Sequence, residues 1–286
     1  MPKVSAAQAG HFSIGGDLKV NRLGFGAMRI TGKGIWGPPA DRREAIRTLK
    51  RLADTGVDFI DTAEAYGPYV SEELIHEALH PYKGLVIATK GGLQRSGPDA
   101  WQQDGRPEVL RRSVEGSLKR LGLDQLPLWQ LHRIDSKVPR KEQFDVIRDF
   151  RKEGLIKHVG LSEVGVADIE EAENYFQVVT VQNRYSPAAR GADAVLEYCE
   201  DHTIGFIPWA PLGSGRLASG ASTLETIAKK YKATTGQIAL AWLLKRSPVI
   251  LPIPGTGKVA HLEENVAAAG IELSDEDEEA ITNSRH

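Results

Sequence analysis

Five successive apolar runs in the middle of this 286-residue chain each end in polar residues. The polar ends are Asp61, Lys90, His132, Ser162 and the pair Gln182-Asn183. A strand buried on both faces of a sheet is expected to be apolar along its length. Polar residues at five consecutive strand ends, with an aspartate and a lysine on neighbouring runs, therefore predict a functional site rather than isolated structural groups.

These residue types suit the addition of hydride to a carbonyl group. The reaction leaves negative charge on the carbonyl oxygen, which then needs a proton. Tyr66 lies five residues beyond Asp61 and can supply that proton, but a free phenol titrates near about pH 10. We expect the charge of Lys90 to lower the pKa of Tyr66, and Asp61 to hold Lys90 in place. His132 is expected to donate a hydrogen bond to the carbonyl oxygen.

The elements that must position these residues form a regular alternation along the chain. Eight short apolar runs are each typical of a buried parallel strand. They cover residues 22–28, 57–61, 84–90, 126–132, 156–162, 178–183, 204–210 and 249–254. Amphipathic stretches between them have helical periodicity, such as 106–122, with Pro107 at its start and Gly122 at its end. The pattern predicts a (β/α)₈ barrel of the TIM type in a single domain spanning residues 1–286.

Three further segments have readable signals. Residues 11–20 predict an N-terminal β-hairpin with Gly15-Gly16 at its turn. Residues 91–106 form the longest irregular stretch, and in a barrel they would lie at the catalytic face and shape a substrate pocket. We therefore expect Trp101 to contact substrate, with Trp36 and Tyr69 at the mouth of the same pocket.

Composition excludes several classes of function. The formal net charge is −2, which favours neither nucleic acid nor an anionic membrane as a partner. No apolar run approaches the roughly 20 residues that span a bilayer, and the N-terminus has no apolar signal region. The one cysteine, Cys199, is expected to pack in a helix rather than react. These features predict a cytoplasmic protein whose partner is a small molecule rather than nucleic acid or a membrane, with an oligomeric state that the sequence does not determine.

The motifs together resemble the aldo-keto reductase family. The segment DFIDTAEAYGPYVSEELIHEAL is similar to its aspartate–tyrosine motif, ATKGG to its lysine strand and LWQLHRID to its histidine strand. The resemblance covers residues 18 to 283. It implies a barrel that binds NADPH without a Rossmann fold and reduces aldehydes or ketones. It also implies a catalytic tetrad of Asp61, Tyr66, Lys90 and His132, with Tyr66 as the general acid and with Tyr66 and His132 contacting substrate.

The resemblance also implies which residues bind the cofactor. Ser162 and Gln182 match carboxamide contacts, Trp209 matches the ring that stacks on the nicotinamide, and Asp61 lies nearby. The remaining positions match contacts to the nicotinamide ribose, the pyrophosphate and the adenosine phosphate, in chain order. They are Gly26, Met28, Leu212, Gly213, Gly215, Gly255, Thr256, Lys258, His261, Glu264 and Asn265.

Three positions depart from the family pattern. Glu163 stands where many members have asparagine, Gly255-Thr256 where many have Lys-Ser, and His261 where many have arginine. The last two changes reduce the positive charge expected near the 2′-phosphate of NADPH, which Lys258 can restore in part. NADH is therefore retained as a possible cofactor. The segments GFGAM and GPPADR are most similar to bacterial reductases that include pyridoxal reductases, so pyridoxal is a candidate substrate.

Four other interpretations compete with this one. The segment HEALH, from His76 to His80, matches a zinc-protease motif, but it is followed at once by Pro81 and no third ligand is evident, so no metal is expected. The segment GSGRLA, from Gly213, matches a short dinucleotide motif in the wrong order of elements. Lys90 could form a Schiff base with a carbonyl. A cofactor-sensing subunit on the same fold, as in ion-channel β-subunits, remains the alternative to an enzyme.

Overall fold

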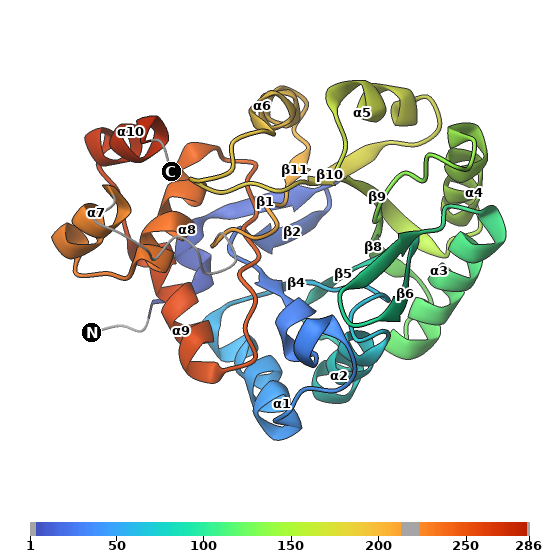
Figure 1. Ribbon diagram of the computed structural model, residues 1–286, viewed down its shortest axis with the longest axis horizontal. Coiled ribbons are helices and arrows are strands. Elements are labelled where there is room, and N and C mark those ends of the chain that lie inside the picture. Colours follow the sequence, from blue (N-terminus) through green and yellow to red (C-terminus); the bar gives the residue numbers. More distant parts are fainter. Residues whose placement is uncertain (1–3, 213–222, 285–286) are drawn as a thin grey trace.

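The computed structural model describes residues 4–212 and 223–284. A curled sheet of parallel strands has the order β11-β10-β9-β8-β5-β4-β3, and helices surround it (Figure 1). Its strands are β3 (Phe25–Gly26), β4 (Phe59–Asp61), β5 (Val86–Gly91), β8 (Leu126–Leu131), β9 (Ile156–Ser162), β10 (Val178–Gln182) and β11 (Gly205–Phe206). Apart from a closing segment, this is the predicted arrangement of strands in chain order.

The predicted eighth strand, residues 249–254, closes the barrel although it is not a regular strand. On one side, Phe206 N–H donates to Val249 O at 2.8 Å, and Leu251 N–H donates to Phe206 O at 2.8 Å. On the other side, the carbonyl oxygens of Pro252 and Pro254 accept from Gly24 and Gly26, at 2.9 and 3.4 Å. Prolines have no N–H, so this segment cannot form a complete ladder. The (β/α)₈ barrel is confirmed.

The helices that pack around the sheet correspond to the amphipathic stretches of the sequence. They are α1 (Arg42–Arg51), α2 (Val70–Leu79), α3 (Pro107–Leu121), α4 (Arg140–Lys152), α5 (Val166–Glu173), α6 (Asp193–Asp201), α7 (Thr223–Tyr231), α8 (Thr235–Arg246), α9 (Val259–Ala267) and α10 (Asp275–Asn283). Pro107 occupies the first turn of α3, and Gly122 ends it in the left-handed conformation at φ 64°. Cys199 is buried in α6, as predicted, and burial raises the pKa of its thiol to about 12.

Alternation along each strand sends side chains to two different environments. In β8, Trp129 packs edge-on against Phe150 of α4, with ring centres 6.2 Å apart. Its neighbour Gln130 bonds to a residue of β4 across the barrel interior. In β5, Thr89 bonds to Glu72 of α2, whereas Lys90 contacts residues of the β4 segment. The period of two thus separates the helix-facing residues from those available to a site.

Two hairpins lie outside the barrel sheet. The predicted N-terminal hairpin consists of β1 (His11–Ile14) and β2 (Leu18–Asn21), and Gly15 and Gly16 have positive φ at its turn. The segment predicted as an irregular loop after β5 is instead a second antiparallel hairpin, β6 (Leu93–Gly97) and β7 (Ala100–Gln103). That prediction was wrong because its polar, glycine-containing sequence pairs through backbone hydrogen bonds, for which no apolar alternation is needed.

Candidate active site

A cavity of about 800 Å³ opens at the carboxyl ends of the barrel strands. Its walls bring together the ends of β3, β4, β9 and β10 with the closing segment and the β6–β7 hairpin. The lining residues include Gly26, Met28, Asp61, Tyr66, Trp101, His132, Ser162, Gln182, Trp209, Leu212 and Gly255. Most of the predicted site residues therefore share one cavity, as polar strand ends on a parallel barrel require.

Lys90 is fully buried, and its ammonium group uses all three of its donors. It donates to Asp61 Oδ1 at 2.6 Å, to the carbonyl oxygen of Thr62 at 2.7 Å and to the Tyr66 hydroxyl at 3.3 Å. Burial lowers the pKa of Lys90, but the charges of Asp61 and Tyr66 outweigh it and raise the pKa overall. A protonated ammonium group is not a nucleophile, so this geometry disfavours a Schiff base at Lys90.

Both carboxylate oxygens of Asp61 accept hydrogen bonds. Oδ1 accepts from Lys90, while Oδ2 accepts from the side-chain amides of Gln130 and Gln182, each at 2.9 Å. Gln130 was not among the residues predicted from the sequence. It lies two positions before His132, which follows directly after β8, and it is the one polar residue inside the apolar run that leads to His132. That position was the available signal.

Tyr66 reaches the cavity from the loop after β4. A turn in which Tyr66 N–H donates to Ala63 O, at 3.1 Å, folds the loop back over the barrel, and Gly67 follows with φ 104°. The Tyr66 ring is almost perpendicular to the His132 ring, with centres 6.0 Å apart. Burial raises the pKa of the Tyr66 phenol, and the opposing effect of Lys90 is smaller. The expected lowering of this pKa is therefore wrong, because desolvation outweighs the lysine charge.

His132 is a neutral imidazole in this environment. Burial lowers its pKa well below the ordinary value, and the charges of Lys90 and Arg133 act in the same direction. Its Nδ1 atom is buried and has no hydrogen-bond partner among the described residues. A neutral imidazole has one N–H to donate, so His132 can orient an oxygen atom without adding charge.

Glu163, which departs from the family pattern, holds Trp209 in place. Glu163 adopts a left-handed backbone conformation with φ 58°, and its Oε1 accepts from the Trp209 indole N–H at 2.6 Å. The same oxygen accepts from Arg184 N–H at 2.7 Å. Next to it, Ser162 Oγ donates to Gln182 O at 2.9 Å and accepts from Arg133 at 3.0 Å. A carboxylate at position 163 therefore orients the ring that was predicted to face the nicotinamide.

Gly26 and Gly255 meet at the seam where the barrel closes. A methyl group added at Gly255 would lie 2.6 Å from Gly26 O, and one at Gly26 would lie 2.6 Å from Ile253 O. Only glycine allows this approach of two backbone segments. Both residues line the cavity together with Met28, whereas Gly213 and Gly215, with the rest of GSGRLA, lie outside the described residues.

The predicted adenosine-phosphate segment leads into the first turn of α9, but an acidic residue already occupies that end. Glu44 of α1 accepts from Val259 N–H, the first residue of α9, at 3.0 Å. This hydrogen bond is the main reason that the pKa of Glu44 is lowered. The exposed His261 lies 4.0 Å from Glu264, which also accepts from Thr234 at 2.9 Å.

The remaining predicted positions of this segment lie around the same turn. Lys258 is an exposed residue, and its N–H donates to Thr256 Oγ1 at 3.1 Å. Asn265 lies further along α9 and is buried. None of these residues lines the cavity near Tyr66.

Of the aromatic residues predicted to contact substrate, Trp101 lines the cavity and Trp36 does not. The Trp101 ring is 6.4 Å from the His132 ring and is stacked by the Arg95 guanidinium at 3.7 Å. Arg95 also lies 5.7 Å from the Trp36 ring, so Trp36 supports the cavity wall from behind. Tyr69 is 43% exposed and contacts Arg120, away from the lining residues.

Helix α2, which lies on the outside of the barrel (Figure 1), contains His76 of HEALH, and His80 is the residue that caps its end. His76 Nδ1 is 3.0 Å from Leu121 O, and the His76 and His80 rings are in contact with centres 4.7 Å apart. No group of three potential metal ligands is present within residues 4–212 and 223–284. Nor does that part of the chain contain a helix with the length and hydrophobicity needed to cross a membrane.

Comparison with known proteins gives a consistent result. The model of the aldo/keto reductase family matches residues 22–285. An uncharacterised oxidoreductase of Schizosaccharomyces pombe is 60% identical over 96% of this chain and 89% of its own length. Pyridoxine 4-dehydrogenase of Escherichia coli is 42% identical over 91% of this chain and 93% of its own.

Solved structures are similar as well. A thermostable aldo-keto reductase bound to the inhibitor epalrestat has a TM-score of 0.83 at 31% identity, over 95% of this chain and 98% of its own. An aldo-keto reductase of Klebsiella pneumoniae in complex with NADPH has a TM-score of 0.80 at 26% identity, over 95% of this chain and 93% of its own.

Proposed function

The chain belongs to the aldo/keto reductase family of oxidoreductases, and we propose that it reduces aldehydes or ketones to alcohols with NADPH, reversibly. One observation carries the proposal. A buried lysine donates to both a carboxylate and the tyrosine hydroxyl, and that hydroxyl lines an open cavity beside a neutral histidine. This arrangement provides a proton donor, a charge that stabilises its conjugate base, and a hydrogen-bond donor for an oxygen atom.

The proposed mechanism assigns one task to each side chain. The carbonyl oxygen of the substrate accepts hydrogen bonds from the Tyr66 hydroxyl and from His132, which polarises the carbonyl. As charge develops on this oxygen, Tyr66 transfers its proton to it. Lys90, 3.3 Å from the Tyr66 oxygen, stabilises the phenolate that remains. Asp61 keeps Lys90 protonated and in place, and Gln130 and Gln182 orient Asp61.

The cavity walls fit a nicotinamide cofactor, which would supply the hydride. Ser162 and Gln182 offer polar atoms for its carboxamide, and Trp209, held by Glu163, offers a flat apolar surface for its ring. Met28 and Leu212 extend the apolar lining toward Gly255, where the described cavity ends. Two relatives support this choice, because Klebsiella pneumoniae aldo-keto reductases have been solved with NADPH and with NADP.

The preference for NADPH over NADH rests on the first turn of α9. Lys258 and His261 are basic residues at that turn and favour a phosphate. Glu44 acts against it, because it accepts the Val259 N–H that a phosphate would otherwise contact. We therefore propose NADPH as the main cofactor with a modest preference, and NADH as a functional substitute.

Pyridoxal is the substrate that we propose to test first. The E. coli relative is named pyridoxine 4-dehydrogenase, an activity that interconverts an alcohol and an aldehyde. Trp101 at the cavity wall can stack on a flat aromatic ring, and Tyr66 and His132 lie beyond it.

The experiment measures NADPH oxidation with a panel of carbonyl compounds that includes pyridoxal, for the wild type and for Tyr66→Phe. We expect Tyr66→Phe to lower kcat by at least about a hundredfold, because the proton donor is removed. NADPH binding, measured by tryptophan fluorescence, should not change. Unchanged turnover in Tyr66→Phe would refute the assignment. Tight NADPH binding with no turnover on the whole panel would instead support a cofactor-sensing subunit.

A further inference from the structure

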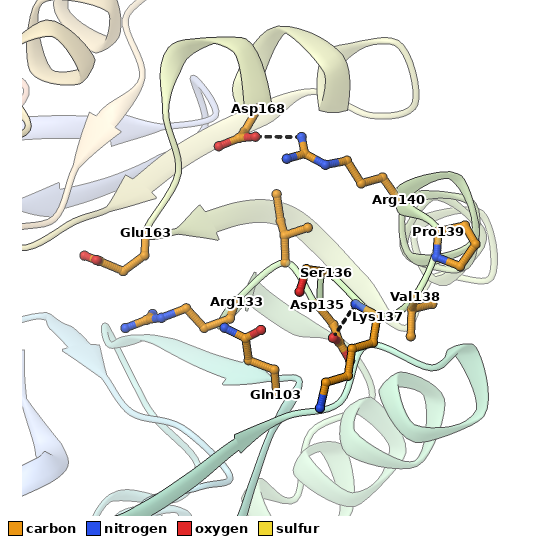
Figure 2. Close-up of a pocket in the computed structure, with 11 residues that line it drawn as sticks. Gln103, Arg133, Asp135, Ser136, Lys137, Val138, Pro139, Arg140, Glu163 and Asp168 are labelled. Carbon is orange, nitrogen blue, oxygen red and sulfur yellow. Dashed lines mark hydrogen bonds and ion pairs between the residues drawn. The ribbon is translucent and has the colours of Figure 1, made fainter.

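A second cavity, of about 600 Å³, is lined by the residues drawn as sticks in Figure 2. It lies between the segment 133–140, which follows β8, and the segment after β9 that leads into α5. Arg133 and Gln103 line both cavities, so the two adjoin at these side chains. A substrate whose carbonyl group meets Tyr66 can therefore extend past Arg133 into the second cavity.

The carboxylates that line the second cavity already have donors. Asp135 accepts from Gly105 N–H at 3.0 Å and from Lys137 N–H at 2.9 Å. Asp168 is paired with Arg140 at 2.6 Å, on one side of the cavity in Figure 2. Glu163 is engaged by Trp209 and by a backbone N–H, as described above. These acidic groups consequently do not need a cation from a ligand.

Two cationic side chains of the second cavity, Arg133 and Lys137, are not paired with a carboxylate in this way. Arg133 is partly buried, and its Nη1 donates to His132 O at 2.6 Å and to Ser162 Oγ at 3.0 Å, both uncharged acceptors. Lys137 lies at the exposed rim. Within residues 4–212 and 223–284, no carboxylate lies within 4 Å of the charged nitrogens of either side chain. The more distant Glu163 carboxylate favours the Arg133 charge, but burial has the larger effect and lowers its pKa. An anion brought by a ligand would offset the part of this desolvation cost that Glu163 leaves.

We propose that the second cavity binds an anionic group, a carboxylate or a phosphate, carried by the carbonyl substrate. Arg133 is its main partner, because it lines both cavities and, among the described residues, only its Nη1 donates to an acceptor. Lys137 adds a second positive charge at the rim. The preferred substrates would then be aldehydes or ketones with an acidic group on the far side of the molecule from the carbonyl. This proposal rests on the reductase function proposed above.

The test compares matched substrates that differ only in charge. Meta- and para-formylbenzoate are compared with their methyl esters, and pyridoxal 5′-phosphate is compared with pyridoxal, which separates carboxylate from phosphate preference. The readout is the selectivity ratio, kcat/KM for the anion divided by kcat/KM for its neutral partner. We expect this ratio to fall about tenfold or more in Arg133→Gln and about two- to fivefold in Lys137→Gln. Arg133→Lys should retain part of the preference.

Lys141→Gln is the matched control. Lys141 is an exposed lysine on α4, close to Lys137 in sequence, but it pairs with Asp145 and does not line the cavity. Its substitution should leave the selectivity ratio at the wild-type value. An increase in salt should lower the ratio in the wild type and less so in Lys137→Gln, because the rim charge is screened.

Two results would overturn the proposal. The first is an unchanged ratio in both Arg133→Gln and Lys137→Gln. The second is an equal loss for anionic and neutral substrates in Arg133→Gln, with weaker NADPH binding by fluorescence, which would place Arg133 in the cofactor site. Calorimetric binding of formylbenzoate to the NADP-loaded protein keeps the two proposals distinguishable. If no carbonyl compound is reduced, binding that is weakened by Arg133→Gln still supports the subsite, and binding that is unaffected contradicts it.

Discussion

Replacement of Lys90 by methionine removes one member of a fully buried ion pair. The Lys90 and Asp61 side chains are 0% and 2% exposed, and their charged atoms are 2.6 Å apart. Lys90→Met leaves the Asp61 carboxylate buried with only the two glutamine amides as partners, whereas Asp61→Asn leaves the ammonium of Lys90 without its counter-ion. Asp61→Asn combined with Lys90→Met leaves neither charge. We expect the double variant to lose less stability than the sum of the losses in the two single variants.

The magnitudes follow from the burial of the pair. Removal of one partner of a buried ion pair costs about 3–5 kcal/mol, because the other charge stays desolvated. For a chain of this length, about 1 kcal/mol corresponds to about 2 °C in Tm, so each single variant should melt about 6–10 °C lower. Simple addition would give about 12–20 °C for the double variant. We expect about 4–8 °C, since it loses packing and hydrogen bonds at Thr62 and Tyr66 but contains no unpaired buried charge.

Thermal unfolding followed by circular dichroism measures these shifts, and the NADPH-dependent reduction of an aldehyde should be lost in all three variants. The control is the pair Lys245 and Asp275, whose charged atoms are also 2.6 Å apart but whose side chains are 32% and 96% exposed. Lys245→Met should change Tm by no more than about 2 °C. A double variant whose Tm loss equals the sum of the single losses would refute the reasoning, as would single variants with the small shift of the control.

Three further predictions concern acidic residues. Glu163→Ala removes the hydrogen-bond acceptor that lies 2.6 Å from Trp209 Nε1. We expect NADPH to bind about five- to tenfold more weakly in a fluorescence titration, and Glu163→Gln to retain more affinity. An affinity equal to that of the wild type in Glu163→Ala would contradict this positioning role. Glu44→Gln removes the negative charge of α1 that lies beside Val259, the first residue of α9. The affinity for NADPH relative to NADH should therefore increase about two- to fivefold. No change in that ratio would exclude Glu44 as a determinant of cofactor preference. Burial raises the pKa of Glu64 from 4.5 to about 7, so the folded state retains this proton where the unfolded state has lost it. The stability contributed by protonated Glu64 is therefore complete below pH 4.5 and is lost as the pH rises to about 7, by at most roughly 3 kcal/mol. Denaturant unfolding should show a smaller loss over this range in Glu64→Gln, and an unchanged pH dependence would refute the assignment.

The sequence alone was sufficient for the architecture and for the core of the site. The alternation of short apolar runs with amphipathic stretches is typical of helices packed on a parallel sheet, and eight such units in a chain of this length favour a closed barrel with its strands in chain order. In such a barrel the carboxyl ends of all the parallel strands lie on the same side, so Asp61, Lys90 and His132 are brought together there. Their meeting depends on strand order and not on side-chain detail, which is why local patterns were enough to predict it.

Other features depend on contacts between residues far apart in the chain, and only the tertiary structure decided them. Gln130 is recognisable in the sequence as a polar residue inside an apolar run, but only the structure shows that its amide lies 2.9 Å from Asp61. The segment 91–106 has no strand pattern, yet it pairs with itself as β6 and β7. Glu163 departs from the family pattern, and only the position of Trp209 shows what the carboxylate does.

The pKa of Tyr66 is another feature that only the tertiary structure decided. The residue types correctly indicate that a lysine beside a phenol lowers its pKa, but they do not show how much water the fold removes from both. In the folded protein burial has the larger effect, and the pKa of Tyr66 is raised. Residue identity and spacing determine which groups come together, because these are local properties of the chain. Desolvation and three-dimensional contact determine how those groups behave, because both depend on every segment that packs around the site.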